Sequence, residues 1–202
     1  MPAPTDKGHL IDIDTSRPIW HRFFTVAPLV LIGTTEPDGS LDLAPKHMVT
    51  PMGWQNYFGF VCSPTHSTCK NIARTGVFTV SYPKPSQVLC SSLAASPRQA
   101  GHKPVLECFT TFPAQQIEGE FIDEAYLYFE CRHFKTIDGF GSNCLITGEI
   151  IAAYADVDFI RHDDIDDQET IHDSPLFAYL APGRFAAIER SNAFPFPAHM
   201  KK

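Results

Sequence analysis

The prolines set the first limit on what this chain can fold into. The sequence contains 17 prolines and 16 phenylalanines in 202 residues. Proline breaks helices and is excluded from the centre of a sheet, whereas aromatic and β-branched residues favour strands. The chain is therefore expected to form short strands and loops, without long helices.

Several apolar runs have the length and composition of strands, and turn residues separate them. The expected strands are Pro28–Thr35, Ser40–His47, Tyr57–Cys62, Val77–Tyr82, Tyr126–Ile137 and Leu145–Tyr154. Glu36–Gly39 joins the first two strands as a hairpin turn, and Asp138–Ser142 is expected to be a turn before the last.

Short helices are expected between these strands. Ser67–Thr75 begins with hydroxyl residues and is followed by Gly76, which predicts a capped helix. Ser86–Ala95 is expected to be helical, with Pro97 ending it, and Glu107–Gln116 to be a short helix or a packed loop.

Strands that follow one another without regularly alternating helices predict an antiparallel β-barrel or sandwich and argue against a parallel Rossmann-type sheet. The chain length fits one domain over residues 1–202. We expect a core at about residues 18–160 and a C-terminal extension at residues 161–202.

The charge and the cysteines exclude several classes of function. The net charge of −7 opposes binding of a phosphate backbone, so nucleic acid is not an expected partner. No apolar run approaches the ~18 residues of a membrane helix, so no membrane association is expected. The six cysteines form no Cys-x-x-Cys pair, and the polar N-terminus has no signal core. We therefore expect free thiols in a cytoplasmic protein without a metal site.

One polar segment has the composition of an anion site. Ser63, Thr65, His66, Ser67, Thr68, Lys70 and Asn71 surround the expected start of the helix at residue 67. The first amides of a helix have no intrahelical partner and favour phosphate, and hydroxyls and a lysine add donors. The alternative is an ordinary capped helix with a solvated loop.

A second segment, Leu43–Pro51, contains two prolines, Pro45 and Pro51, that bracket a polar and apolar stretch. Because proline cannot donate to a β-ladder, the strand here is expected to be broken or at a sheet edge. Freed backbone groups can bond a flat heteroaromatic ring, with Lys46 or His47 near a negative group. The alternative is a strand end that turns into a surface loop.

Taken in order, these segments resemble the flavin reductase-like group of FMN-binding split β-barrel proteins, which includes flavoredoxins and small reductase components of two-part monooxygenases. The resemblance extends from about Pro28 to Asp156. The matching stretches are Pro28–Thr35, Pro37–Gly39, Asp42–Pro45, Thr68–Ile72, Thr75–Val80 and Leu145–Ile150.

The resemblance implies a mainly β, antiparallel Greek-key split barrel with short inserted helices, normally a homodimer with FMN near the subunit interface. It implies that Lys46, His47, Met48, Val49 and Thr50 lie along the ring and ribityl chain of FMN. It also implies that residues from His66 to Asn71 hold the phosphate and ribityl end, with Thr68 and Asn71 on recurring family positions.

The resemblance further implies that NAD(P)H reduces the bound flavin, which passes electrons to free flavin or another acceptor. No side chain is expected to be catalytic, since the cofactor carries the chemistry. Many relatives have histidine where this chain has Asn143, which holds no proton at neutral pH. This departure leaves a non-enzymatic flavoredoxin-type electron carrier as an alternative. A β-barrel that binds another ligand or a protein partner, without flavin, is the third possibility.

Overall fold

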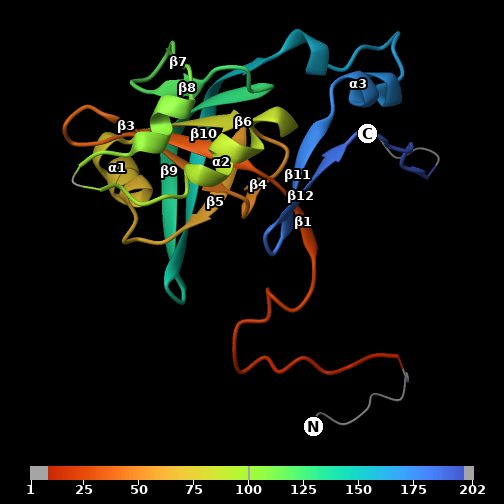
Figure 1. Ribbon diagram of the computed structural model, residues 1–202, viewed down its shortest axis with the longest axis horizontal. Helices are drawn as coiled ribbons and strands as arrows, with labels where there is room; N and C mark the ends of the chain where they lie inside the picture. The colour runs from red at the N-terminus through yellow and green to blue at the C-terminus, as the bar shows by residue number, and fades with distance from the viewer. Residues whose placement is uncertain (1–8, 100, 198–202) are drawn as a thin grey trace.

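The computed structural model describes residues 9–99 and 101–197, and its centre is one curled antiparallel sheet (Figure 1). The sheet has seven strands in the order β3-β2-β6-β9-β10-β5-β4. Their bounds are β2 Val30–Thr35, β3 Leu41–Lys46, β4 Val49–Pro51, β5 Tyr57–Cys62, β6 Val77–Tyr82, β9 Leu127–Phe140 and β10 Asn143–Ala155.

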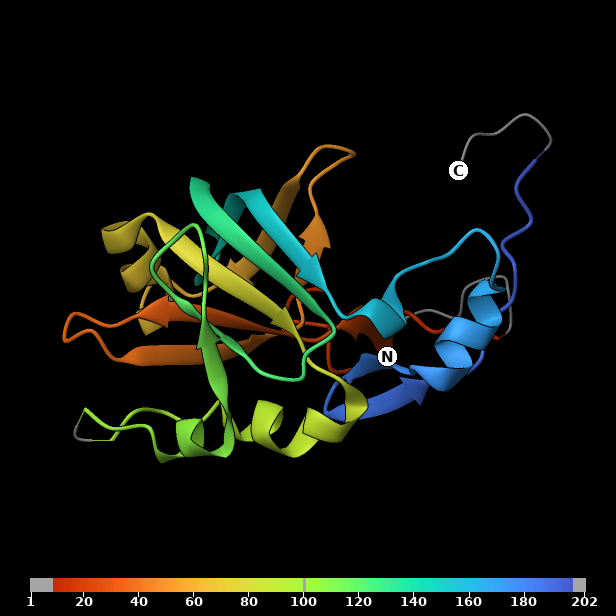
Figure 2. The ribbon, with the colours of Figure 1, turned by 90° about the horizontal axis from the view of Figure 1, so that it is seen from above.

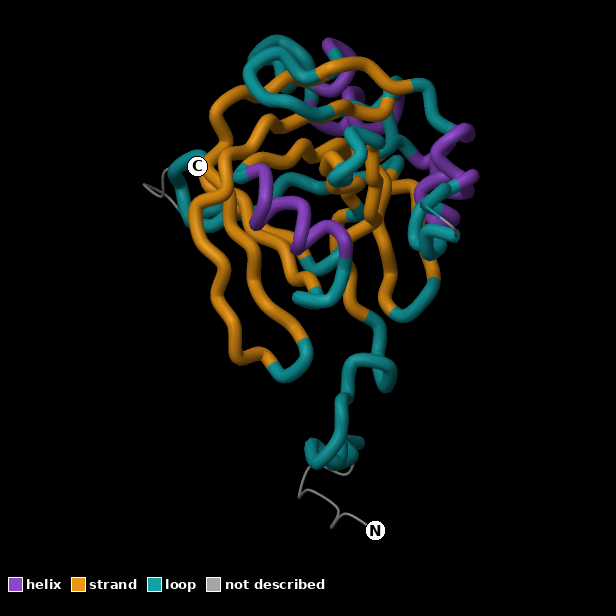
Figure 3. Tube along the Cα trace, turned by 90° about the vertical axis from the view of Figure 1, so that its left-hand side faces the viewer, coloured by secondary structure: helices purple, strands orange, loops and turns teal. Residues whose placement is uncertain are grey.

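The order of the strands explains why the sheet curls. β3 and β4 are the two opposite edges, yet only His47 and Met48 separate them in the chain. A flat sheet would hold its edges too far apart for so short a link, so the strands wrap around a core (Figure 3). Pro45 and Pro51 lie on these edge strands, as expected from their missing N–H groups.

Phenylalanine fills the interior of the barrel. Phe58, Phe60 and Phe78 are almost fully buried, and the rings of Phe60 and Phe78 meet edge to face with centroids 5.5 Å apart. A second apolar cluster around Phe121 and Tyr128 includes residues of the small sheet formed by β7 (Thr111–Pro113) and β8 (Glu120–Ile122).

Carboxylates are buried as well, and the most deeply buried is that of Glu130. Glu130 is fully buried, and its oxygens accept backbone N–H groups of Gln115, Gln116 and Ile117 at 2.7–3.0 Å. The Tyr154 hydroxyl donates a further bond at 2.9 Å. These bonds replace the water that the charge loses on burial.

Helix α1 runs from Ser67 to Thr75, which are the predicted bounds, and ends at Gly76 with a left-handed φ of 74°. The predicted Ser86–Ala95 helix is a 3-10 turn, η1 (Pro85–Gln87), followed by α2 (Val88–Leu93). The other helical elements are η2 (Pro104–Cys108), η3 (Val157–Phe159) and α3 (Asp167–Asp173). No helix among the described residues is long and apolar enough to cross a membrane.

The C-terminal extension forms strands that the sequence analysis did not predict. β11 (Leu176–Ala181) and β12 (Arg184–Ile188) make a hairpin, and β1 (Thr25–Pro28) pairs with β11 to complete a three-stranded sheet. This sheet and α3 lie beside the barrel (Figure 2). Phe194 and Phe196, near the C-terminus, contact each other with ring centroids 4.8 Å apart.

Two local predictions were wrong. The turn expected at Asp138–Ser142 is confined to Gly141 and Ser142, because β9 continues to Phe140 opposite Asn143. The helix or loop expected at Glu107–Gln116 contains the end of η2 and then strand β7.

Candidate functional site

A cavity of about 500 Å³ lies between β3, the start of α1 and the segment after α2, and we call it the charged cavity. Pro45 and Lys46 are the last two residues of β3, an edge strand of the barrel, and both line this cavity. The residues that line it are Asp42, Ala44, Pro45, Lys46, Thr65, His66, Ser67, Thr68, Ala94, Ala95, Ser96, Pro97, Arg98 and Lys103.

The start of α1 is open toward this cavity. The N-cap residue is His66, which makes no side-chain cap bond, so the predicted hydroxyl cap was wrong. The N–H groups of Cys69 and Lys70 donate to the His66 carbonyl. Among the described residues, no acceptor bonds the N–H groups of Ser67 and Thr68. The first turn contains no acidic residue, so these two amides and the positive helix end favour an anion.

Two cations of the cavity wall are held by the protein itself. The Lys103 ammonium is only 6% exposed and donates to Asp42 Oδ1 at 3.0 Å and to the Leu43 carbonyl at 2.7 Å. Arg98 donates to the carbonyls of Leu41 and Gly101 at 2.9 and 3.0 Å. These bonds fix the 94–103 segment against β3 and keep two positive charges at the wall.

Lys46 is the more available cation. It lines the cavity and forms no ion pair with a carboxylate among residues 9–99 and 101–197. Its ammonium lies close enough to the Cys62 thiol to oppose the rise in pKa that burial causes there. A ligand phosphate therefore has one lysine that no carboxylate neutralises.

Three thiols lie behind the start of α1. Cys69 and Cys144 place their sulfurs 3.9 Å apart, and the Cys144 thiol donates to the Cys62 carbonyl at 3.3 Å. Burial raises the pKa of Cys62, and burial together with Cys69 raises the pKa of Cys144 to about 11. These two thiols are therefore neutral near pH 7 and add no negative charge against a bound anion.

The predicted site residues do not all gather at this cavity. The structure brings together Lys46, His66, Ser67 and Thr68, whose hydroxyl-bearing side chain is 2% exposed. Ser63 lies just outside, where its hydroxyl shares a hydrogen bond of 2.9 Å with Thr65. The remaining predicted residues are His47, Met48, Val49, Thr50, Lys70 and Asn71.

Those remaining residues have other surroundings. Asn71 is buried and donates to the Thr34 hydroxyl at 3.1 Å, and Lys70 is exposed on α1 away from the cavity lining. Met48 is largely exposed and Val49 packs against the barrel core. The exposed Thr50 hydroxyl donates to the Pro51 carbonyl.

His47 lines a second cavity of about 350 Å³, which shares Pro45 and Ala95 with the charged cavity. We call it the aromatic cavity, because rings from His47, Phe177, Tyr179 and Phe185 contribute to its wall. The shared residues make the two cavities neighbours in one groove.

Asp42, Arg98 and Lys103 were missed as site residues by the sequence analysis. Arg98 and Lys103 come from a loop more than fifty positions beyond β3 in the sequence, and only the fold brings them to Asp42. The sequence signal for them was weak, since a lone arginine and lysine in a loop are usually solvated.

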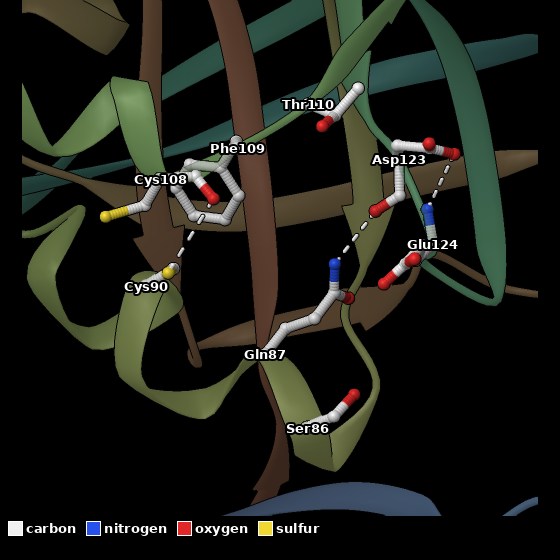
Figure 4. Close-up of a pocket in the computed structure, with 8 residues that line it drawn as sticks. All are labelled: Ser86, Gln87, Cys90, Cys108, Phe109, Thr110, Asp123 and Glu124. Carbon is white, nitrogen blue, oxygen red and sulfur yellow. Dashed lines mark hydrogen bonds between the residues drawn. The ribbon is translucent and has the colours of Figure 1, made fainter.

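A third hollow, of about 200 Å³, lies between α2 and the turn after β8 (Figure 4). Its polar groups largely bond one another: Gln87 donates to the Asp123 carbonyl at 2.8 Å, and Cys90 points to the Cys108 carbonyl. The residues that line it include Asp123 and Glu124 but no lysine or arginine, so it is unsuited to a phosphate.

Solved structures with the same fold carry several names. The Pseudomonas fluorescens 2-nitrobenzoate 2-nitroreductase aligns with a TM-score of 0.73 and 20% identity over 87% of each chain. The Methanosarcina acetivorans flavoredoxin gives 0.72 and 21%, covering 94% of this chain and 95% of its own. Component B of nitrilotriacetate monooxygenase from Bacillus cereus gives 0.76 and 14%, covering 93% and 98%.

At these low sequence identities the solved structures show a shared fold alone. The match to a family model shows which family the chain belongs to. The flavin reductase like domain matches residues 23–165. This range includes the curled sheet, α1 and every residue that lines the charged cavity. The split barrel expected from the sequence is confirmed by this match and by the neighbouring folds. The chain therefore belongs to the flavin reductase-like domain family.

Proposed function

We propose that this protein is an FMN-binding oxidoreductase that takes electrons from NAD(P)H through bound flavin to free flavin or another small acceptor. The observation that carries the proposal is the open start of α1, where two unpaired amides face a cavity beside Lys46. Membership of the flavin reductase-like family makes a flavin phosphate the natural anion for this position.

The residues present fit a phosphate joined to a planar ring. The N–H groups of Ser67 and Thr68 bind phosphate oxygens, the Thr65 and Thr68 hydroxyls add donors, and Lys46 neutralises charge. The ring then lies along the backbone that leads from Lys46 toward Thr50. When bound, the isoalloxazine supplies the hydride and electron transfer, so the chain's own task is binding, orientation and exclusion of water.

The three named neighbours have different printed activities, so their likeness does not select the acceptor of this protein. Asn143 favours a second candidate function, a flavoredoxin-type electron carrier without NAD(P)H turnover. It begins β10 as an exposed residue and lines none of the three cavities described above. Its amide holds no transferable proton at neutral pH.

Absorbance titration of the purified protein with FMN and with riboflavin tests the flavin assignment. The two ligands share a ring and differ in the phosphate, so FMN is expected to bind about 10–100-fold more tightly, the worth of one charged hydrogen bond. Equal affinities would place the phosphate outside the charged cavity. Failure of both ligands to bind would overturn the flavin proposal and leave a barrel for another ligand or partner.

NAD(P)H oxidation separates the two flavin functions. With FMN in excess, an NAD(P)H-dependent reductase consumes nicotinamide continuously, which is read as loss of its near-ultraviolet absorbance. Tight FMN binding without any such turnover would reject the reductase and support the electron carrier. Running the assay with NADH and NADPH in parallel assigns the donor.

We also propose a homodimer in a reducing compartment such as the cytoplasm. Trp54 is 97% exposed, and Phe134 and Phe140 extend an apolar surface along the β9–β10 hairpin. Such exposed rings favour a covered interface. The six cysteines are all free, which suits a reducing compartment. Light scattering on a size-exclusion column tests the dimer, and a monomeric mass would reject it.

A further inference from the structure

The aromatic cavity has features of a binding site of its own. Its volume of about 350 Å³ lies within the range of small-molecule sites. Its walls pair rings: His47 and Tyr179 have centroids 4.6 Å apart, and Phe177 meets Phe185 edge to face at 5.8 Å. Flat apolar walls of this kind accept a planar aromatic ligand.

Two of the polar side chains that line this cavity, the exposed Arg184 and the buried Ser91, lack partners among the described residues. Arg184 forms no ion pair or side-chain hydrogen bond within the part of the chain that the structure describes. Ser91 is fully buried against the cavity, and its hydroxyl has no hydrogen-bond partner there. A buried hydroxyl without a partner loses about 1–3 kcal/mol, so an acceptor arriving beside it is stabilised.

The charge of the cavity selects the charge of the ligand. Among the lining residues, Arg184 is the one with a permanent charge. His47 adds little, because burial and the nearby Lys46 lower its pKa and favour the neutral ring. One guanidinium matches one carboxylate in a bidentate pair, whereas the pyrophosphate of a dinucleotide requires more cations.

From these features we propose that the aromatic cavity binds a small aromatic carboxylate, with its ring between the aromatic walls and its carboxylate on Arg184. A cavity of ~150 Å³ already holds benzene, so the volume suits one substituted ring. The position beside the charged cavity would place this ligand next to the flavin, and that placement alone rests on the proposed function.

Most of the aromatic wall, and the arginine of this cavity, come from the C-terminal extension and not from the part of the chain that matches the family model. Phe177, Tyr179, Arg184 and Phe185 all lie on β11 or β12, beyond the family match that ends at residue 165. The Tyr179 hydroxyl is already bonded, since it accepts the Gly183 N–H at 2.9 Å. This bond ties the turn of the hairpin to the ring wall, and Arg184 is the cationic group beside it that meets the ligand's charge.

Isothermal titration of the full-length protein, saturated with FMN, with benzoate and with benzamide tests the proposal. The two probes have the same shape and differ in charge. We expect benzoate to bind about 10–100-fold more tightly than benzamide, as a charged hydrogen-bonded pair provides. Arg184→Gln is expected to abolish this preference. The control Arg190→Gln changes an exposed arginine outside the cavity lining and is expected to preserve it.

Three results would overturn the proposal: no preference for benzoate in the wild type, an equal loss in both variants, or benzoate binding to the FMN-free protein that is lost when FMN is added. The last would mean that the flavin ring itself occupies the aromatic cavity. The FMN titration of the same samples is read separately. Arg184-dependent benzoate binding in a chain that binds no FMN would support the cavity and reject the flavin assignment.

Discussion

The barrel and the C-terminal extension stabilise their strands in different ways. In the barrel, strands β2, β5, β6, β9 and β10 share a continuous apolar interior. Glu130, buried between β9 and the β7–β8 loop, has protein partners for both of its oxygens. In the extension, Phe177 and Ala178 are buried, but Phe185 and Phe194 are 52% and 71% exposed. A two-stranded hairpin is marginal by itself, so β11 and β12 depend on β1 and on the barrel wall. The barrel is therefore expected to set global stability, and the extension to open first.

The largest effect is expected from Glu130→Gln in the barrel. The substitution keeps the shape of the side chain but replaces an acceptor oxygen with an amino group that faces backbone N–H donors. With charged hydrogen bonds at ~1.5–3 kcal/mol each, we expect the free energy of unfolding to fall by about 3–5 kcal/mol in urea denaturation. Glu118→Gln, on an exposed side chain of the same loop, is the control. Equal urea midpoints would show that the buried bonds contribute little.

A smaller loss of stability is expected from Gly148→Ala in β10. A Cβ at this position would lie 2.6 Å from the Phe78 ring and 3.1 Å from the Cys131 Cβ, so both must shift. Overpacking of this kind costs about 1–3 kcal/mol of unfolding free energy. Phe78→Leu removes the ring atoms that clash, so the double variant is expected to lose less than the sum of the single variants. Additive losses would contradict this cause.

Ligand binding provides a third comparison, between two lysines near the same helix. Lys46→Met removes the cation that lines the charged cavity, and FMN affinity is expected to fall about 10–100-fold by absorbance titration. Lys70→Met removes an exposed cation on α1 and is expected to leave the affinity nearly unchanged. Riboflavin affinity should respond to neither. A larger effect of Lys70→Met would return the phosphate to the position expected from the sequence.

The difference between the barrel and the extension also explains which strands could be predicted from the sequence. Strands such as Val30–Thr35 and Val77–Tyr82 were found because a short apolar run stands between clear turn residues, and α1 because Gly76 ends it. In the extension, Pro182 and Gly183 form the turn of a hairpin that was not predicted. The strands of the extension are short and partly exposed, so their sequences lack a clear alternation of apolar and polar residues from which a strand could be predicted.

The candidate site was predictable only where its residues are contiguous. Ser67 and Thr68 were found from one local segment around the helix start. Arg98 and Lys103 join Asp42 through tertiary contacts, and Arg184 reaches the groove on a strand from the extension. The anion site at the helix start was also predicted from this segment, but the hydroxyl cap was not formed, because the backbone places His66 at the N-cap position.

The smallest effect is expected where the two regions meet. The Lys84 ammonium in the barrel contacts Asp156 Oδ2 at 2.6 Å, and Phe159 stacks on Tyr126 with centroids 4.7 Å apart. The hydrogen bonds from Lys84 and the Asp158 amide hold the pKa of Asp156 below its usual range. Because the folded pKa is depressed, this contribution is present above the unfolded pKa of ~3.9 and is lost as the pH falls through the lower folded value.

Asp156→Asn therefore tests whether this contact fixes the end of β10, from which the chain continues into the extension. A partly exposed ion pair contributes about 0.2–1 kcal/mol, so we expect a loss of that size in the free energy of unfolding at pH 7. The difference from the wild type is expected to vanish once the pH falls below the lowered folded pKa of Asp156. Amide exchange of β11 and β12 should accelerate more than that of β6 and β9, because the extension opens without the barrel. Asp158→Asn keeps the backbone amide that bonds Asp156 and is the matched control. Uniform acceleration across both regions would mean that the extension unfolds only together with the barrel, which would reject the difference in stability between them.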